Sequence, residues 1–394
     1  MLSGLLSLGG AATIKPGALW AADGRSVQRW NGFRSAPRWQ RLDIVGGDTL
    51  LVSAKVAGVP VQAILDTGSG ATIVSKPLAA TLGRPDREAR TLSGLSAKTR
   101  VDLVRDVDVA FSGETRRLPF VVVADLGAMT AAFGSPVDML LGADMLSDAC
   151  LAFDIGERRF ATAPSGSFRP AADWAELTLR RGTRQELLVL ASIHGLAPAP
   201  MMLDSGSSAA LMLSSSYMGA NELLTTQPTS TAALGTVEGV QIVRTLTVDK
   251  VALGAFLVGS VPALALDRWA SESAVGNIGM PLLGQFDLVL DLSAARLWLR
   301  AADAGSRLPL LKDRSGLGLA PSPASLTVVH VAANSPASGG WTSGDEIVAI
   351  NGVRIDESYK SGWLWRWRYG APGTRVLFAL KSGEQRQLVL EDYY

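Results

Sequence analysis

A repeated six-residue string constrains the fold of this chain more than any local pattern does, because an internal repeat implies duplicated structural units. The string Ile-Leu-Asp-Thr-Gly-Ser at residues 64–69 returns 138 residues later as Met-Leu-Asp-Ser-Gly-Ser at residues 202–207. An alternating apolar run precedes each string, at residues 50–56 and 187–193, and such alternation is typical of half-buried β-strands. We therefore expect two copies of one mostly β unit.

A second landmark in each copy keeps nearly the same spacing. Gly142 ends an apolar stretch in the first copy, and Gly279 ends the corresponding stretch 137 residues later. A segment containing Gly, Pro and Ser at residues 164–172 is typical of a linker between the copies. The sequence thus predicts one unit at residues 38–165 and another at residues 166–302.

The remaining residues form two further regions. With 394 residues, the chain is long enough for two or three domains that each bury a core. After a break at residues 301–307 the pattern changes, so we predict a small separate domain at residues 307–394, with strands and a helical stretch near residues 357–369. Residues 1–37 are predicted to form an N-terminal arm.

The N-terminal arm begins with an uncharged stretch, residues 1–14, that is too short to cross a bilayer, which takes about 20 apolar residues. The stretch is typical of the hydrophobic part of a signal peptide, with Ala21 and Ala22 near a cleavage point, but the positively charged beginning is missing. A partial signal, a pro-segment and a loosely ordered arm all stay open. We favour a periplasmic or exported protein slightly over a cytoplasmic one.

Charge and metal-ligand content exclude several classes of function. Lys and Arg number 37 against 36 Asp and Glu, so no net field is available to hold a nucleic acid. Cys150 is the one cysteine, which excludes an internal disulfide and a thiolate metal cluster. His194 and His330 lie too far apart in sequence to suggest a zinc helix. We predict no metal and no cofactor, and any acid–base chemistry near neutral pH must rest mainly on carboxylates.

The two aspartates of the repeated strings can supply that chemistry. One Asp-hydroxyl-Gly loop would be an ordinary turn, but two copies suggest a pseudo-twofold axis that sets Asp66 and Asp204 face to face. Two carboxylates that close cannot both ionise readily, so they share a proton. Such a pair can deprotonate a water as it attacks a carbonyl carbon and can then protonate the leaving amine, which is the chemistry of peptide hydrolysis.

With these motifs, residues 38–300 resemble the aspartic peptidases of the pepsin and retropepsin type, and the short copies are most similar to a fused retropepsin dimer. The resemblance implies a mainly β fold with two pseudo-twofold-related lobes and a catalytic cleft between them. It assigns catalysis to Asp66 and Asp204. Since both aspartates come from one chain, a monomer suffices for catalysis.

The same resemblance implies roles for the neighbouring residues. Thr67 and Ser205 would tie the two loops together beneath the aspartates, and the serine after each glycine would hydrogen-bond the carboxylate. The implied catalytic-loop support therefore comprises Thr67, Gly68, Ser69, Ser205, Gly206 and Ser207. Flexible flap hairpins are expected around Gly94 and Gly235, although neither carries the tyrosine of pepsin-like flaps.

Residues 307–394 resemble a PDZ domain, which is a small β-sandwich or barrel with helices. The string Gly316-Leu317-Gly318-Leu319 is similar to the loop whose backbone N–H groups receive the terminal carboxylate of a peptide, with the two leucines at a hydrophobic pocket. The resemblance implies a C-terminal peptide ligand that adds a strand to the edge of a sheet.

Other conspicuous residues are predicted to be structural. Asp154 and Asp291 also repeat, but each precedes a turn that Asp commonly closes. Trp363 and Trp367 would share one face of a helix in the core of the tail, with Trp365 left as a surface or groove contact.

Three hypotheses follow. The first is an aspartic endopeptidase that cuts protein or peptide substrates, with the PDZ-like tail docking or gating them. The second is a catalytically silent adaptor that uses the cleft and the tail only to bind peptides. The third is a tail that packs on the lobes as a regulator. The sequence leaves open the substrate, the working pH, the role of the arm and the oligomeric state.

Overall fold

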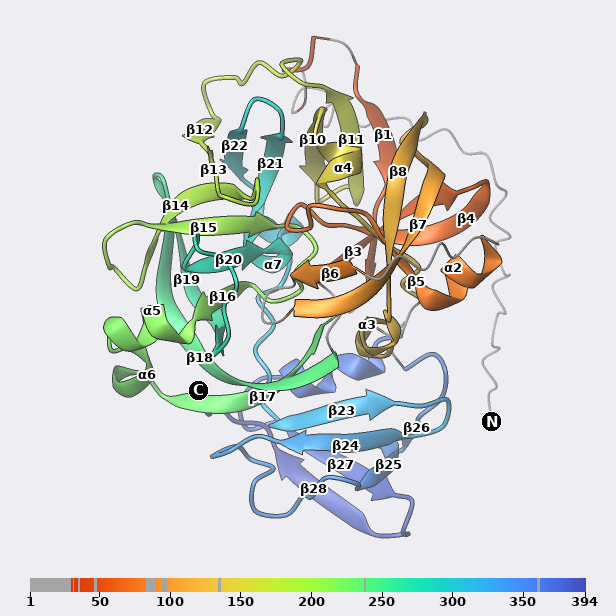
Figure 1. Ribbon diagram of the computed structural model, residues 1–394. Helices are drawn as coiled ribbons and strands as arrows, with labels where there is room; N and C mark the ends of the chain where they lie inside the picture. The colour runs from red at the N-terminus through yellow and green to blue at the C-terminus, as the bar shows by residue number, and fades with distance from the viewer. Residues whose placement is uncertain are drawn as a thin grey trace, which may run out of the picture.

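The structure is a computed structural model, and it describes residues 30, 32–34, 36–45, 48–82, 90–93, 98–133, 136–236, 239–359 and 362–394. Over these residues the chain is mainly β, as predicted. Two lobes lie side by side, and the tail packs below them (Figure 1).

The first lobe is built on an eight-stranded sheet. Its β4 runs parallel to β9, and β5 runs antiparallel to β9 on the other side. β3 also pairs with β7, which curls the sheet towards a barrel. The strand order is β2 (Asp43–Val45), β3 (Thr49–Val56), β4 (Val59–Leu65), β9 (Met139–Leu141), β5 (Ile73–Ser75), β8 (Glu114–Ala124), β7 (Lys98–Phe111) and β6 (Arg90–Ser93).

The second lobe repeats this sheet strand for strand, which confirms the duplication. β15 runs parallel to β20, β16 runs antiparallel to β20, and β14 makes the extra pairing with β18. The order is β13 (Arg180–Arg181), β14 (Leu187–Ile193), β15 (Ala199–Asp204), β20 (Gly276–Gly279), β16 (Leu211–Ser214), β19 (Phe256–Leu266), β18 (Gly239–Leu253) and β17 (Thr229–Thr236).

Among the described residues, two short helices of each lobe occupy corresponding places, and a third lies in a different place in each lobe. In each lobe, a serine hydroxyl at the end of a short strand caps the next helix by accepting a backbone N–H, from Leu78 to Ser75 and from Tyr217 to Ser214. The helices are α2 (Lys76–Thr81), α3 (Gly127–Phe133) and α4 (Ala143–Leu146) in the first lobe, and α5 (Ser215–Ala220), α6 (Leu223–Thr226) and α7 (Met280–Leu283) in the second.

A third sheet joins the lobes (Figure 1). Its central strands β10 and β21 come from different lobes and pair antiparallel, with Cys150 opposite Asp291 and Phe153 opposite Leu288. This pairing relates the lobes by a pseudo-twofold axis. The order is β1 (Arg38–Arg41), β11 (Arg159–Pro164), β10 (Ala149–Asp154), β21 (Phe286–Asp291), β22 (Arg296–Ala301) and β12 (Ala175–Thr178).

The repeated aspartates of this sheet are structural, as predicted. Asp154 accepts the backbone N–H of Glu157 and the guanidinium of Arg159. Asp291 likewise accepts the backbone N–H of Ala294. The indole N–H of Trp30 also donates to Asp154, at 2.9 Å, so the end of the predicted arm packs against the lobes.

The tail has a core of its own around Trp341, Trp367 and Phe378. Its sheet runs β23 (Leu317–Pro321), β24 (Leu326–Val331), β25 (Glu346–Ile350), β27 (Arg375–Leu380) and β28 (Gln385–Val389), with β26 (Val353–Arg354) beside β25. The 3₁₀ helix η2 (Leu364–Tyr369) completes it, and the 3₁₀ turn η1 (Ala304–Ser306) lies in the segment before the tail.

The prediction for the tail tryptophans was wrong for two of them. Trp363 is 68% exposed, whereas Trp365 is 8% exposed and lies in the core with Trp367. The helix is of the 3₁₀ type, with three residues a turn, and begins only after Trp363, so the spacing expected for an α-helix does not apply.

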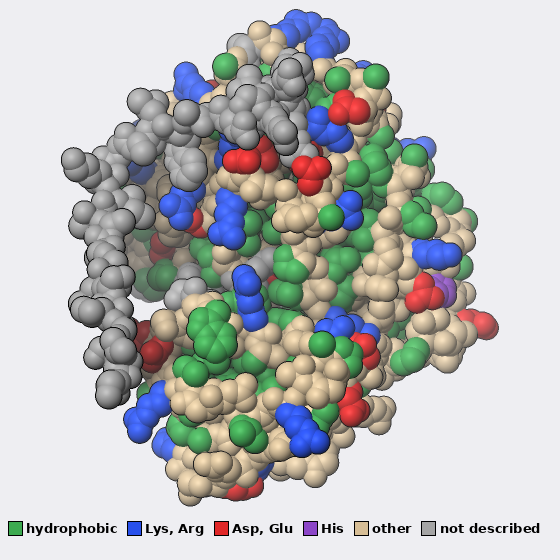
Figure 2. Space-filling model, turned by 180° about the vertical axis from the view of Figure 1, so that it is seen from behind, with side chains coloured by type: hydrophobic (Ala, Val, Ile, Leu, Met, Phe, Trp, Pro, Cys, Tyr) green, Lys and Arg blue, Asp and Glu red, His purple; other side chains and the backbone are tan. Residues whose placement is uncertain are grey.

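The surface is mixed in charge. Basic and acidic side chains are interspersed over the face in Figure 2, in keeping with the net charge of +1. No helix among the described residues has the length and hydrophobicity needed to cross a membrane.

Candidate active site

The two Asp-hydroxyl-Gly loops meet at the pseudo-twofold axis and are tied together by their hydroxyls. Thr67 Oγ1 donates to the carbonyl of Leu203 at 3.0 Å and accepts the N–H of Ser205 at 3.1 Å. Ser205 Oγ donates to the carbonyl of Leu65 at 2.6 Å and accepts the N–H of Thr67 at 3.2 Å. The four bonds are buried and reciprocal, so each loop satisfies polar groups of the other.

The glycines of the two strings let the loops approach each other. A Cβ at Gly68 would lie 2.8 Å from Asp204 Cγ, and a Cβ at Gly206 would lie 2.7 Å from Asp66 Cγ. Real Cβ atoms do not approach a carbon so closely, so only glycine fits at either position. Each aspartate therefore packs over the glycine of the opposite loop, and the two carboxyl groups face each other.

Gly142 and Gly279, the later glycines of the repeat, also permit a close approach of two backbone segments. A Cβ at Gly142 would lie 2.4 Å from the carbonyl carbon of Ala71, and one at Gly279 would lie 1.9 Å from the carbonyl oxygen of Ala209. β9 and β20 thus pass directly against the loops that carry the aspartates.

The environment of the carboxyl groups favours a retained proton. Asp204 is 6% exposed, whereas Asp66 is partly exposed. Burial, and next the charge of Asp204, raise the pKa of Asp66 to about 8. Burial also raises the pKa of Asp204, while hydrogen bonds from Asn277 and Gly206 oppose that rise. The pair is therefore suited to share one proton over a broad pH range.

Two segments of the chain, residues 52–145 and 189–282, match a family model described as aspartyl protease. Both segments are similar to aspartyl proteases. Each segment contains one aspartate of the facing pair and the later glycine of its lobe. No curated protein matches the chain. The interlobe sheet and the tail lie outside the two matched segments.

The serines after the glycines act through their backbone. Ser69 donates its N–H to Asp66 at 3.0 Å, but its hydroxyl donates to the carbonyl of Ala71. The hydroxyl of Ser207 likewise donates to the carbonyl of Ala209, at 3.3 Å. The expected bond to the carboxylate thus comes from the backbone in the first lobe, because each hydroxyl closes its own loop.

Two polar residues of the matched segments, residues 52–145 and 189–282, escaped the sequence analysis. Asp144 accepts the hydroxyl of Thr72 at 2.6 Å and its N–H at 2.9 Å, while Gly142 donates its N–H to the same hydroxyl. Asn277 is fully buried and donates to Asp204 at 2.6 Å. The sequence signal that could have found them is their position, because Asp144 follows the repeated Gly142 by two residues and Asn277 precedes the repeated Gly279 by two.

The flap predictions fall on equivalent hairpins, β6–β7 and β17–β18. Gly94 follows the end of β6 in the sequence and lies outside the described residues. Gly235 lies in β17, opposite Val240 and one pair from the last pair of the hairpin.

The predicted peptide loop of the tail is engaged internally. The N–H of Gly316 donates to Asp313 at 3.0 Å, and that of Leu317 donates to Ser315 Oγ at 3.1 Å. These two groups are therefore not free for the carboxylate of a ligand. The Leu317 side chain is fully buried in the tail core, and Leu319 packs partly against it.

The same loop lies against the hairpin of the second lobe. A Cβ at Gly318 would lie 3.3 Å from Ala233 Cβ in β17. Thr231 Oγ1 shares a hydrogen bond of 2.9 Å with the ring of His330 in β24. The tail is thus in direct contact with the hairpin that carries Gly235.

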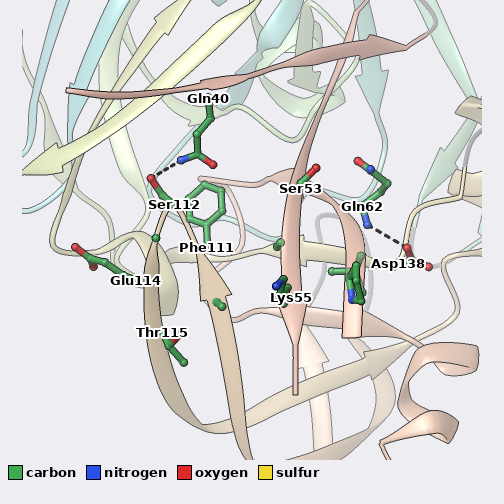
Figure 3. A pocket seen from close by; sticks show the side chains of 14 residues that line it. Gln40, Ser53, Lys55, Gln62, Phe111, Ser112, Glu114, Thr115 and Asp138 are labelled. Atoms are coloured by element: carbon green, nitrogen blue, oxygen red, sulfur yellow. Dashed lines mark hydrogen bonds between the residues drawn. The ribbon is translucent and has the colours of Figure 1, made fainter. Parts of the chain in front are cut away.

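A pocket of about 540 Å³ opens elsewhere on the first lobe, between β3, β4 and the β7–β8 turn (Figure 3). Gln40 donates to Ser112 across it, and the backbone N–H of Gln62 donates to Asp138. Neither aspartate of the facing pair lines it. Among the described residues there is also no group of three or more His, Cys, Asp or Glu side chains that could hold a metal ion.

Proposed function

We propose that the protein is an aspartic endopeptidase whose catalytic residues are Asp66 and Asp204. The observation that carries the proposal is the reciprocal packing of each carboxyl group over the glycine of the opposite loop, which leaves the two groups facing each other. The aspartyl-protease match in both copies supports it. The loop support comprises Thr67, Gly68, Ser69, Ser205, Gly206 and Ser207.

The geometry suits hydrolysis by an activated water. The ionised carboxyl group of the pair accepts a proton from water as the water oxygen bonds to the peptide carbonyl carbon. The protonated group donates a hydrogen bond to the carbonyl oxygen, where negative charge develops. When the C–N bond breaks, the nitrogen takes up a proton from the pair, and the products are a carboxylic acid and an amine.

Cleavage profiling by mass spectrometry on a peptide and protein library, from acid to neutral pH, tests this proposal. We expect cuts by the full chain and by the variant Asp108→Asn. Asp108 is an exposed aspartate away from the facing pair, so this variant is the matched control for the same substitution. Asp66→Asn and Asp204→Asn should make none, because neither pair can exchange the proton. Cuts that persist in both variants contradict the proposal. Peptide binding without cleavage by the wild type would instead favour the silent adaptor.

We further propose that residues 38–165 and 166–302 are the lobes and that residues 307–394 are a PDZ-type domain that regulates the hairpin β17–β18. The contacts of Thr231 and Ala233 with the tail support regulation over capture of a free C-terminal peptide. Leu308 packs in the core of the lobes, so the linker is best cut after it.

Thr231→Val tests this role of the tail in the full chain. Loss of the bond to His330 should raise hydrogen–deuterium exchange in β17 and change turnover, whereas Thr229→Val on the same strand should do neither. Faster turnover would indicate that the tail holds the hairpin over the cleft, and slower turnover that it positions the hairpin for substrate. Unchanged exchange and turnover would contradict regulation through this contact.

A further inference from the structure

The two lobes differ at one buried position beside the facing aspartates. In the second lobe, Asn277 Nδ2 donates to Asp204 Oδ2 at 2.6 Å, and the Asn277 side chain is fully buried. β20 sets Asn277 opposite Met202 in β15. In the first lobe, β9 sets Leu140 opposite Ile64 at the equivalent position of β4. A side chain that cannot donate a hydrogen bond thus replaces the amide beside Asp66.

The other donors to the two carboxyl groups match across the axis. Asp66 accepts the backbone N–H groups of Gly68 and Ser69, each at 3.0 Å. On Asp204, the N–H of Gly206 donates to the carboxyl group at 3.1 Å, and the N–H of Ser207 also lowers its pKa. Within the part of the chain that the structure describes, the Asn277 amide is the side-chain amide donor that has no counterpart at Asp66.

Burial and the Asn277 amide have opposite effects on the pKa of Asp204. Asp204 is more buried than Asp66, so desolvation alone would leave the shared proton on Asp204. A short hydrogen bond from a neutral donor stabilises the ionised form of the group that accepts it. The amide therefore works against the asymmetry that burial by itself would impose.

We propose that Asn277 is a positioning residue that decides which aspartate of the pair carries the proton: Asp204 is held ionised and Asp66 is held protonated. This inference rests on the proposed function. It makes Asp204 the group that takes the proton from water and Asp66 the group that donates to the carbonyl oxygen of the substrate.

No cation contributes to this assignment among the described residues around the pair. The titratable group that acts on Asp204 is Asp66. The remaining groups that face Asp204, from β20 and from its own loop, are the neutral amide of Asn277 and the backbone N–H groups of Gly206 and Ser207.

The test is the pH profile of kcat/KM for Asn277→Leu. This variant gives the second lobe the leucine that the first lobe has at the equivalent position, Leu140. Without the amide, Asp204 should protonate more readily, and the acid limb should move to higher pH by about one unit or more. The alkaline limb reports deprotonation of Asp66, and it should stay in place because Asp204 is already ionised before and after that deprotonation. A bell-shaped pH profile of kcat/KM that narrows only on its acid side is an outcome that simple destabilisation of the fold does not produce.

Two variants serve as controls. Met212 lies opposite Asn277 in β16, and Met212→Leu changes the packing around the amide but not its donor, so the acid limb should not move. Leu140→Asn supplies the missing donor to Asp66 and should move the alkaline limb to lower pH. An acid limb that stays in place in Asn277→Leu, or that moves equally in Met212→Leu, overturns the inference.

A readout without catalysis separates this inference from the proposed function. In the full-length Asp66→Asn background, Asp204 titrates without its partner, and ¹³C-labelled aspartate carboxyl signals report its titration, assigned by loss of the signal in Asp204→Asn. Adding Asn277→Leu, or Asn277→Ala if the leucine variant does not fold, should raise the titration midpoint by about one pH unit. A lowered midpoint would mean that Asn277 stabilises protonated Asp204 through its oxygen, which also overturns the inference.

Discussion

Replacement of Thr67 by valine is the most informative test of the tie between the loops. Valine keeps the shape of threonine but removes the hydroxyl, so no cavity forms. The carbonyl of Leu203 then loses its donor at 3.0 Å, and the N–H of Ser205 loses its acceptor at 3.1 Å. Each buried polar group left without a partner costs about 1–3 kcal/mol. We expect a loss of about 2–6 kcal/mol in the free energy of unfolding.

Urea denaturation followed by circular dichroism measures this loss. Ser205→Ala removes the mirror-image bonds to Leu65 and Thr67 and should cost a similar amount. Thr225→Val is the matched control, because the exposed hydroxyl of Thr225 also donates to a backbone carbonyl, that of Glu222. An exposed substitution of this kind should change stability by about 0.5 kcal/mol or less. Equal costs for Thr67→Val and Thr225→Val would refute the reasoning.

Two further predictions concern the aspartates. In Gly206→Ala, the new Cβ would lie 2.7 Å from Asp66 Cγ and would displace that carboxyl group, so kcat/KM should fall by an order of magnitude or more. Gly219 lies in open space, so Gly219→Ala should leave kcat/KM unchanged. Equal kcat/KM values in the two variants would contradict the packing of Asp66 over Gly206. Because the folded-state pKa of Asp66 is raised from 3.8 to about 8, its contribution to stability is complete below pH 3.8 and is lost as pH rises through 8. Unfolding free energies at pH 5 and pH 8 should therefore decrease with pH in the wild type and decrease less in Asp66→Asn, and a wild type that gains stability over this range would contradict the shift.

The repeat carried most of what could be predicted. Its two strings and later glycines lie in register because each glycine is required by a close approach, and a close approach leaves a mark in the sequence. Alternating runs of apolar residues were enough to place the strands around them, since one face of each is buried.

What the sequence analysis missed depends on contacts between distant residues. Asn277 is a polar residue in a buried strand, and no local rule connects it with Asp204, which is 73 residues away. The tail loop keeps the glycine pattern of a peptide-binding loop, yet Asp313 accepts the N–H of Gly316 and Ser315 Oγ accepts that of Leu317. Asp313 is itself held by Arg368, at 3.0 Å from Nε.

The sequence by itself determined the duplicated β lobes and the two aspartates, because side-chain periodicity and glycine requirements are local properties of the chain. Only the tertiary structure decided how alike the two aspartates are. The lobes share one backbone plan, but Asn277 donates to Asp204 in the second lobe, whereas Leu140 occupies the equivalent strand position in the first. The preference of each carboxyl group for its proton depends on burial and on donors brought together by folding, and these are not properties of the Asp-hydroxyl-Gly strings.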